Sequence, residues 1–383
     1  MFRYELPEHH DSAPGFWRKH AWWLIPLILL DAVAVAWWLR RDRGDDAVPA
    51  AEVAGAVSAT VPEAPPPPPG LVYGFPTAQH SLLSTNLEGI YMPTGSGRLE
   101  SALYGSVRTR PQGSSVLPAF HEGIDIAPLA RDSRQMPTDR ILAAADGRVA
   151  YANRIAGNSN YGRYIVLVHD DPLGEIYTLY AHMEEIDARI RPGLMVRRGE
   201  DMGRMGHSAS TGIPIARAHL HFEAGVIMNQ RFQTWFRHQK LKPDHGNFHG
   251  YNLTGIQPLD VFRRQELYGG FSMLDYLSEL EPAFVVVARV PRKPDYYVRY
   301  PALWEEGDWS GVVTIAVAEG GAPLRGRPAT LEERNELGNQ RHRVVTVDEA
   351  VLGRNGLRLV TRRQGQWVLG RNGEQWLEIL TYH

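Results

Sequence analysis

The sequence contains no cysteine, which excludes disulfide bonds and metal sites built on thiolates. It also lacks a His-Glu-x-x-His motif, the helical pattern that brings a glutamate base to many zinc proteases. The formal net charge is only -2, which gives no reason to expect nucleic acid as a partner. The absence of cysteine is compatible with an extracytoplasmic protein. With 383 residues, the chain is long enough for two or more domains.

Histidine is present instead, in two short motifs. His121 and Asp125 are four residues apart around Gly123, in a segment whose glycine and isoleucines favour strand over helix. His219 and His221 are two apart, so alternation in a strand places both on one face. Imidazoles with one carboxylate are typical ligands of hydrolytic zinc. A single His-x-His can fall on a solvated strand by chance, but two such pairs in apolar strand sequence favour a metal site.

These motifs resemble the lysostaphin-type (LytM-like) zinc metallopeptidases, which cleave peptide cross-bridges in peptidoglycan. That family combines a His-x-x-x-Asp motif with a later His-x-His, and a further histidine lies between them in a Tyr-x-His context, here His182. The resemblance covers residues 98 to 262, and five reactive positions in the right order make it specific. The segments that carry it are His121–Ala127, Ala145–Val149, Tyr177–His182 and His219–Glu223.

The resemblance implies a role for each of the five residues. His121, Asp125 and His221 would be the ligands of one Zn²⁺ ion per chain. His182 and His219 would exchange protons with the attacking water and stabilise the oxyanion. A catalytic zinc uses three protein ligands and keeps one position open for water. Without a glutamate base from a His-Glu-x-x-His helix, imidazoles with a near-neutral pKa suit the proton transfer.

Three other ionisable residues lie near these motifs in the sequence. Strand alternation turns Glu122 away from His121, which predicts a structural role. Glu223 shares a strand face with His221, which fits either a hydrogen-bond partner of that ring or a solvated acid at a strand end. His169 ends a predicted strand, and we expect it at the surface.

The segment before the His-x-His motif departs from the family. Ser210–Gly212 would normally lead almost directly into that strand, but residues 213–218 are inserted here. His207 follows a glycine in this altered loop and is a candidate for the substrate groove. Three more histidines lie in a polar, glycine-containing stretch that we predict to be a solvated loop rather than a second metal site: His238, His245 and His249.

The catalytic region, residues 98–265, consists of short strand-like runs separated by turn signals. This pattern predicts a mainly β fold with an antiparallel sheet. A polar stretch at 131–140 is expected to be an extra loop. The candidate strands are Gly123–Ala127, Gly147–Ala152, Tyr164–His169, Glu175–Ala181 and Leu220–Ile227.

Residues 21–39 form a run of nineteen largely apolar residues with paired tryptophans at both ends. This length predicts an uncleaved transmembrane helix that anchors the chain in the cytoplasmic membrane, after a polar, cytoplasmic segment at 1–20. Asp31 and Pro26 make the span imperfect. The alternatives are a cleaved signal peptide and a buried core helix, but no small-residue cleavage site follows closely.

Charge does not fix the orientation of this helix. Two cationic residues precede it and three follow it, so the positive-inside rule does not favour an exported C-terminus. The family resemblance implies a single-pass protein whose catalytic domain lies in the periplasm or another extracytoplasmic space. Residues 40–70 end in five consecutive prolines and predict a stiff linker. Residues 71–97 are expected to be an ordered lead-in segment without an assigned role.

The remainder, residues 266–383, resembles no module that we can name. Phe271–Leu280 is a helix candidate, and Asn-Gly occurs in both copies of a Leu-Gly-Arg-Asn-Gly repeat, at Asn355 and Asn372. Asn-Gly is a strong signal for a two-residue hairpin turn, so we predict a small all-β module. This module and the linker are candidate sites for a protein partner. The candidate strands are Phe284–Val290, Gly311–Ala318, Val344–Val347 and Trp376–Tyr382.

The sequence therefore predicts a membrane-anchored zinc metalloendopeptidase that acts on peptidoglycan stem or cross-link peptides. The alternative is a non-catalytic LytM-like protein that binds the wall or regulates an amidase. Proteins of that kind typically lack one or more of the five positions, all of which are present here. A peptidase for a protein substrate is a third reading, because the loops that would line the groove are the part that departs from the family.

Overall fold

The structure, a computed structural model, describes residues 70–112 and 115–383. These residues belong to one compact unit, Pro66–His383. The predicted cytoplasmic segment, the anchor at 21–39 and nearly all of the linker at 40–70 lie outside the described residues. Within the described part of the chain, no helix is both long and apolar enough to cross a membrane.

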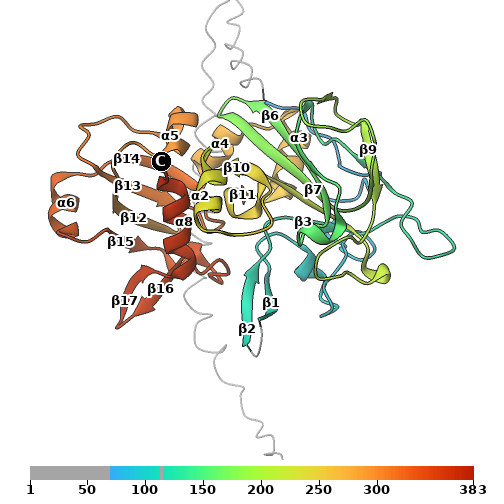
Figure 1. The fold of residues 1–383 in the computed structure, drawn as a ribbon, viewed down its shortest axis with the longest axis horizontal. Coiled ribbons are helices and arrows are strands. Elements are labelled where there is room, and N and C mark those ends of the chain that lie inside the picture. The colour runs from blue at the N-terminus through green and yellow to red at the C-terminus, as the bar shows by residue number, and fades with distance from the viewer. Residues whose placement is uncertain (1–69, 113–114) are drawn as a thin grey trace, which may run out of the picture. The chain divides into compact units, whose positions relative to one another are not determined.

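The main sheet has nine antiparallel strands (Figure 1). Six of them follow one another in the order β11-β10-β7-β6-β5-β8, and β3, β4 and β9 pair outside this path. Strand β3 pairs with β10, and β9 pairs with both β4 and β7. The five strands predicted for the catalytic region are confirmed as β3, β5, β6, β7 and β10. The bounds are β3 (Ile124–Ile126), β4 (Arg140–Leu142), β5 (Gly147–Asn153), β6 (Arg163–Asp171), β7 (Gly174–Ile186), β8 (Met195–Val196), β9 (Asp201–Met205), β10 (Leu220–Ile227) and β11 (Leu253–Gly255).

Strand alternation sorts the residues of this sheet between two faces. On β10, Phe222 and Ala224 contribute to the main hydrophobic core, together with helix α3 (Pro258–Tyr268). On β7, Tyr177 and Leu179 face the other way, into a smaller apolar cluster. Because side chains two apart share a face, the smaller cluster lies on the face that also carries His221. The large core thus supports the sheet from behind, and the polar residues of β10 lie on the opposite face.

The lead-in segment at 71–97 is ordered, as predicted, and packs against the sheet. Tyr91 forms a β-bridge with Ile126 of β3, and the amide of Gly74 donates to the carbonyl of Ala144. Separate from the main sheet, a hairpin joins β1 (Val107–Gln112) to β2 (Ser115–Phe120) and leads directly into His121. Short 3-10 helices lie at Leu99–Ala102, Ala156–Asn158, Ile215–Arg217, Gly246–Phe248 and Gly250–Asn252.

The predicted extra loop at 131–140 is confirmed between β3 and β4, and it contacts the inserted segment at 213–218. The guanidinium of Arg131 donates to the carbonyl oxygens of Ile215 and Ala216, at 2.9 and 3.2 Å. The two departures from the family pattern therefore support each other structurally.

The C-terminal region is an α+β module, so the prediction of an all-β module is wrong. Its sheet has the antiparallel order β14-β13-β12-β15, and β16 and β17 form a separate hairpin. The helix predicted at 271–280 and the first three strands predicted there are confirmed. Helix α2 (Phe232–His238) precedes the module, between β10 and β11. The bounds within the module are α4 (Met273–Glu279), β12 (Phe284–Arg289), α5 (Asp295–Arg299), a 3-10 helix (Pro301–Leu303), β13 (Val312–Val317), β14 (Pro323–Pro328), α6 (Leu331–Leu337), β15 (His342–Val347), α7 (Glu349–Leu352), β16 (Val360–Arg363), β17 (Gln366–Leu369) and α8 (Arg371–Thr381).

The segment predicted as a strand at Trp376–Tyr382 lies mostly in helix α8. Its buried residues Trp376, Leu377 and Leu380 follow the helical period of three to four residues rather than strand alternation. Neither Asn-Gly pair forms a hairpin turn. Gly373 lies inside α8, where an added Cβ would stand 2.0 Å from the carbonyl oxygen of Leu359. This glycine is needed for close backbone packing.

The module is tied to the main sheet through Asn229, a fully buried residue just beyond β10. Its side-chain amide donates to the carbonyl oxygens of Ile379 and Tyr382, at 2.8 and 2.9 Å. Both carbonyls lie at the C-terminal end of α8, where a helix leaves its last acceptors without partners of its own.

Substituting Asn229→Ala should therefore remove the buried donor of both carbonyls, although Ile379 still accepts from the amide of Tyr382 at 3.3 Å, and lower the free energy of unfolding by about 1–3 kcal/mol. Urea unfolding of the purified protein would measure the change. Gln239→Ala is the matched control, because its exposed amide also reaches the module, at Glu378. The control should change stability by less than about 0.5 kcal/mol. Equal effects of the two substitutions would contradict the role assigned to Asn229.

Candidate metal site

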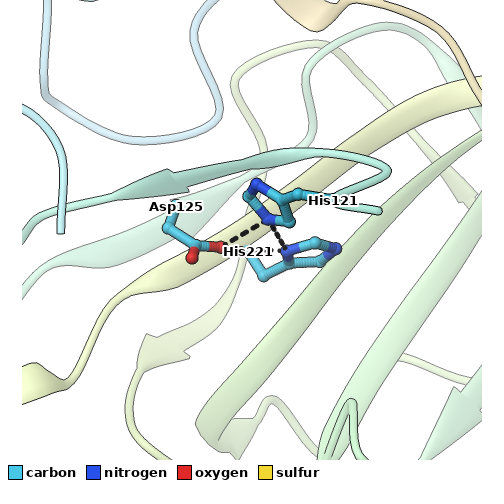
Figure 2. A group of neighbouring side chains, drawn as sticks. All are labelled: His121, Asp125 and His221. Atoms are coloured by element: carbon cyan, nitrogen blue, oxygen red, sulfur yellow. Dashed lines mark hydrogen bonds and ion pairs between the residues drawn. The ribbon is translucent and has the colours of Figure 1, made fainter. Parts of the chain in front are cut away.

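Three side chains from separate segments point toward one another at one edge of β10 (Figure 2). His121 Nε2 lies 3.1 Å from Asp125 Oδ1 and 3.0 Å from His221 Nδ1. His221 Nδ1 lies 2.9 Å from the same oxygen of Asp125. All three residues are buried, and one atom from each lies within 4.8 Å of the others. The structure thus brings together the three predicted metal ligands.

The strand register explains why these residues meet. In the antiparallel pairing of β3 with β10, Asp125 lies directly opposite His221. On its other side, β10 pairs with β7, where Ala181 is opposite His221 and precedes His182. His121 follows the end of β2 and enters from the β1–β2 hairpin. The two motifs, a hundred residues apart, are therefore joined by ordinary sheet pairing.

The atoms on the outer side of these ligands have partners of their own. His121 Nδ1 donates to the carbonyl of Leu103 at 3.0 Å, which leaves its Nε2 directed inward. Asp125 accepts from the guanidinium of Arg108 at Oδ2, at 2.5 Å, while Oδ1 faces the histidines. Arg108 lies in β1 and was not predicted from the sequence. No local spacing relates it to Asp125, which lies beyond the hairpin turn.

Glu223 is the hydrogen-bond partner of His221, the first of the two roles that the sequence left open. It is 0% exposed, and its Oε1 accepts from His221 Nε2 at 2.8 Å. Tyr161 and Tyr177 also donate to this carboxylate, at 2.8 and 2.9 Å. Neither tyrosine was predicted to take part in the site. The two hydroxyls satisfy a charge that would otherwise be costly to bury.

His182 lies in a strained part of β7, next to the three ligands. Its φ is 61°, a left-handed conformation that a residue with a side chain seldom adopts. The pairing of β6 with β7 shifts here, because Arg163 lies opposite Met183 while Ile165 lies opposite Tyr180. A bulge of this kind turns a side chain away from the regular alternation. It brings the ring of His182 to 4.8 Å from that of His219, centroid to centroid.

The hydrogen bonds of His182 and His219 define their tautomers. His182 Nδ1 lies 2.9 Å from the carbonyl oxygen of Ser208, and His219 Nδ1 lies 2.7 Å from that of Arg217. Because a carbonyl only accepts, each Nδ1 carries a proton, and each Nε2 is left free in the neutral ring. His219 Nε2 lies 3.5 Å from Asp125 Oδ1, so it faces the ligand group. All five predicted residues therefore meet in one site.

Burial and hydrogen bonding set the pKa values of this cluster. Burial lowers the pKa of His221, but its hydrogen bonds to Asp125 and Glu223 outweigh that effect and raise it to about 9. Burial would raise the pKa of Asp125, but the neighbouring histidines hold it well below its usual range. Burial, and then the proximity of His219 and His221, lowers the pKa of His182 well below its usual range. His182 is therefore neutral near pH 7 and able to accept a proton.

One prediction about a nearby residue is wrong. His169 is buried, not at the surface, because its ring nitrogens bond to the Asp146 carbonyl and the Thr178 hydroxyl, each at 2.7 Å. Burial lowers the pKa of His169 to about 4. Glu122 is among the residues that line a cavity, and its structural role stays a prediction. Burial, and then the charge of Glu223, raises the pKa of Glu122 to about 7.

The remaining histidines lie outside the ligand group. His207 Nδ1 lies 2.6 Å from the carbonyl of Ile213 in its own loop, and a place for this residue in the substrate groove stays a prediction. His238 is exposed, as predicted. His245 is buried and accepts from the Tyr151 hydroxyl at 2.8 Å, so the prediction of a solvated position is wrong for this residue. His249 is partly buried and packs against Phe236.

The donor set fits a zinc ion. Tetrahedral zinc with bonds of about 2.0–2.2 Å places neighbouring ligand atoms about 3.3–3.5 Å apart, close to the separations of the three inward-facing atoms here. Each ligand is also oriented by a partner on its outer side, an arrangement that metal-binding histidines usually show. His121, Asp125 and His221 would hold the ion, and His182 and His219 would face its open side.

Comparison with known proteins shows that part of the chain is similar to a peptidase family. Residues 119–233 match the sequence model of peptidase family M23, and all five site residues fall within that range. This match confirms the resemblance that the motifs predicted. No curated protein matches the chain.

Three solved structures are similar to part of the chain at low identity. A candidate M23 peptidase from Pseudomonas aeruginosa is 21% identical, with a TM-score of 0.21, over 40% of this chain and 48% of that one. Csd3 from Helicobacter pylori is 21% identical, with a TM-score of 0.23, over 41% and 30%. The catalytic domain of the antimicrobial peptidase lysostaphin from Staphylococcus simulans is 21% identical, with a TM-score of 0.24, over 32% and 77%. The chain spans about half or less of the first two proteins, so the assignment rests on the match at residues 119–233.

The raised pKa of His221 predicts how the metal-free protein responds to pH. A group whose pKa rises from 6.5 to about 9 on folding contributes stability that is complete below pH 6.5 and is lost as the pH rises through 9. In EDTA, the free energy of unfolding should therefore fall by up to about 3 kcal/mol as the pH rises from 6.5 through 9. Each unit of pKa shift corresponds to about 1.36 kcal/mol. Thermal unfolding at each pH would measure it. His221→Gln, which does not titrate, should remove the decline, and an unchanged decline in this variant would contradict the assignment.

Proposed function

We propose that this protein, which carries a peptidase family M23 domain at residues 119–233, is a zinc metalloendopeptidase that hydrolyses peptide bonds in peptidoglycan stem or cross-link peptides. The observation that supports this most is the convergence of a complete ligand group with two further histidines whose Nε2 atoms are free. Non-catalytic LytM-like proteins, the alternative, typically lack one or more of these five positions. None of the five is missing here.

In this proposal, zinc supplies a Lewis acid and lowers the pKa of a water molecule to about 7. His182 accepts the proton of the attacking water at Nε2, because burial keeps its ring neutral and the Ser208 carbonyl holds its other nitrogen protonated. His219 is held in the same tautomer and would stabilise the developing oxyanion or exchange a proton with the leaving amine at Nε2. The strain at His182 fits a position retained for function.

We also propose that residues 21–39 anchor the chain in the cytoplasmic membrane, with the peptidase domain on the extracytoplasmic side. The apolar run with paired tryptophans at both ends supports the anchor. We place the domain on the extracytoplasmic side because the proposed substrate, peptidoglycan, lies there. The charges that flank residues 21–39 do not favour this orientation.

The contrast between His219 and His221 separates the two roles in the proposal. The purified wild-type protein is expected to hold about one zinc per chain. His221→Ala should lose most of this metal, because only two ligands remain. His219→Ala should keep its zinc, while its turnover falls by roughly 10²–10⁴, the usual effect of removing an acid–base group.

Metal analysis and digestion of purified sacculi, with the released muropeptides identified by mass spectrometry, would test all three proteins together. Zinc loss in His219→Ala with retention in His221→Ala would show that the two roles are reversed. A folded, zinc-loaded wild type that releases no muropeptide would support the non-catalytic alternative.

The anchor predicts that the full-length protein stays in the membrane fraction at high salt and in carbonate. A periplasmic reporter fused after Gly70 should be active, because the proposal places that point outside the cytoplasm. The matched control is the same fusion with residues 21–39 deleted, which should give a soluble protein and an inactive periplasmic reporter. An active cytoplasmic reporter after Gly70 would establish the opposite topology.

A further inference from the structure

The segment inserted before the His-x-His motif, residues 213–218, ends directly at His219. Three of its residues, Ile215–Arg217, form a 3-10 helix. A helix of a single turn makes few hydrogen bonds of its own and leaves its last carbonyl oxygens without helical partners. Pro214 and Ala216 are exposed, so the segment lies at the surface. Its conformation therefore depends on contacts with the rest of the chain.

The side chain of Arg131 supplies such contacts. Its guanidinium donates to three carbonyl oxygens of the inserted segment, those of Ile215 at 2.9 Å, Ala216 at 3.2 Å and Ala218 at 3.4 Å. Arginine suits this role because its planar group presents five N–H donors in a fixed fork, whereas the ammonium of lysine is a compact point charge. Arg131 therefore spans the 3-10 helix from its first residue to the residue that follows it.

Arg131 is itself held in place by the extra loop at 131–140. It forms a β-bridge with Pro137, and its guanidinium also donates to the carbonyl oxygen of Gln135 at 2.8 Å. At the base of the loop, the buried carboxylate of Asp139 accepts from the amides of the two residues before Arg131, at 2.8 and 3.1 Å. The loop is therefore a fixed support from which one guanidinium reaches the inserted segment.

The inserted segment in turn orients the ring of His219. The amide of His219 donates to the carbonyl oxygen of Gly206 at 3.1 Å, just before β10 begins. Its Nδ1 lies 2.7 Å from the carbonyl oxygen of Arg217, which lies between two of the residues that Arg131 binds. The opposite edge of the ring faces the ligand group, with Nε2 at 3.5 Å from Asp125 Oδ1. A shift of the Arg217 carbonyl would therefore move or turn this ring.

We propose that Arg131 is a positioning residue for His219 and acts through the inserted segment. The inference rests on the proposed peptidase function, in which His219 contacts the reacting groups. It gives the extra loop and the insertion, the two departures from the family pattern, a shared role at that site. A misplacement of about 1 Å in an active site can lower the rate by about 10²-fold. Without Arg131, the segment adopts other conformations, and His219 is correctly placed for only part of the time.

Two substitutions in the extra loop test this role. Arg131→Ala removes the fork and leaves every residue of the proposed metal site unchanged. Arg134→Ala is the matched control, because Arg134 is an exposed arginine of the same loop. Its amide donates to Asp132 at 2.8 Å, but its guanidinium makes no hydrogen bond with the part of the chain that the structure describes.

Amide hydrogen exchange, followed by mass spectrometry, measures the hold of Arg131 on the segment without requiring activity. In the full-length, zinc-loaded protein in detergent, Arg131→Ala should accelerate exchange at residues 215–219 by about tenfold, because hydrogen bonds that restrain the segment are lost. Arg134→Ala should leave the exchange unchanged. Both variants should keep the zinc content of the wild type, since no ligand is altered. Unchanged exchange in Arg131→Ala, or loss of its zinc, would overturn the inference.

A double-mutant cycle shows whether Arg131 acts through His219. With soluble peptidoglycan fragments as the substrate, the kcat of Arg131→Ala should fall by about tenfold. In a His219→Ala background, the same substitution should change the residual kcat by less than about twofold, because the residue that it positions is gone. An equal loss in both backgrounds would indicate a general structural effect, and a change in KM alone would indicate an effect on the substrate groove. Either result would overturn the inference.

The two measurements separate this inference from the proposed function. Hydrolysis by the wild type with the same kcat in Arg131→Ala would support the peptidase and overturn the positioning role. Faster exchange in Arg131→Ala, without hydrolysis by the zinc-loaded wild type, would overturn the peptidase and support the hold of Arg131 on the segment before His219.

Discussion

The ring of His221 lies between two buried carboxylates, and the organisation of the site depends on this arrangement. Asp125 contacts its Nδ1 at 2.9 Å, and Glu223 accepts from its Nε2 at 2.8 Å. Two acids are costly to bury unless each is paired and hydrogen-bonded. Arg108 donates to Asp125, and the hydroxyls of Tyr161 and Tyr177 donate to Glu223. These three partners come from three different segments, so the electrostatics of the site and the packing of the sheet constrain each other.

The same arrangement gives the neighbouring histidines distinct chemistry. His221 is held between anions, which favours its protonated form in the absence of metal and prepares its Nδ1 for a cation. His182 contacts no carboxylate among the described residues; it meets a backbone carbonyl and two other imidazoles, and its pKa falls instead. Residues of one type, a few ångströms apart, therefore differ in charge because their partners differ. Because a histidine ligand must be neutral, a metal ion at Nδ1 of His221 would displace the proton that the two carboxylates favour.

The sequence could predict the site only where local spacing carries the information. His219 and His221 share a face because strands have a period of two, and His121 and Asp125 meet across a short turn. Arg108, Tyr161 and Tyr177 reach the same site from elements that only the tertiary fold brings close, and nothing in their local sequence marks them. The surface position predicted for His169 was wrong for a related reason, since its burial depends on partners at Asp146 and Thr178.

The C-terminal module is a second case in which local sequence does not show the tertiary contacts. Its contacts also support two strands of the site. Short apolar runs are compatible with both strand and helix, so only the packing of α8 shows that most of Trp376–Tyr382 is helical. The module binds the ends of two catalytic strands. The Tyr300 hydroxyl donates to the carbonyl of Glu175 in β7, and the amide of Ile227 in β10 donates to that hydroxyl at 3.3 Å. His182 and His221 lie toward the opposite ends of these strands. The module therefore supports the two strands that carry both histidines.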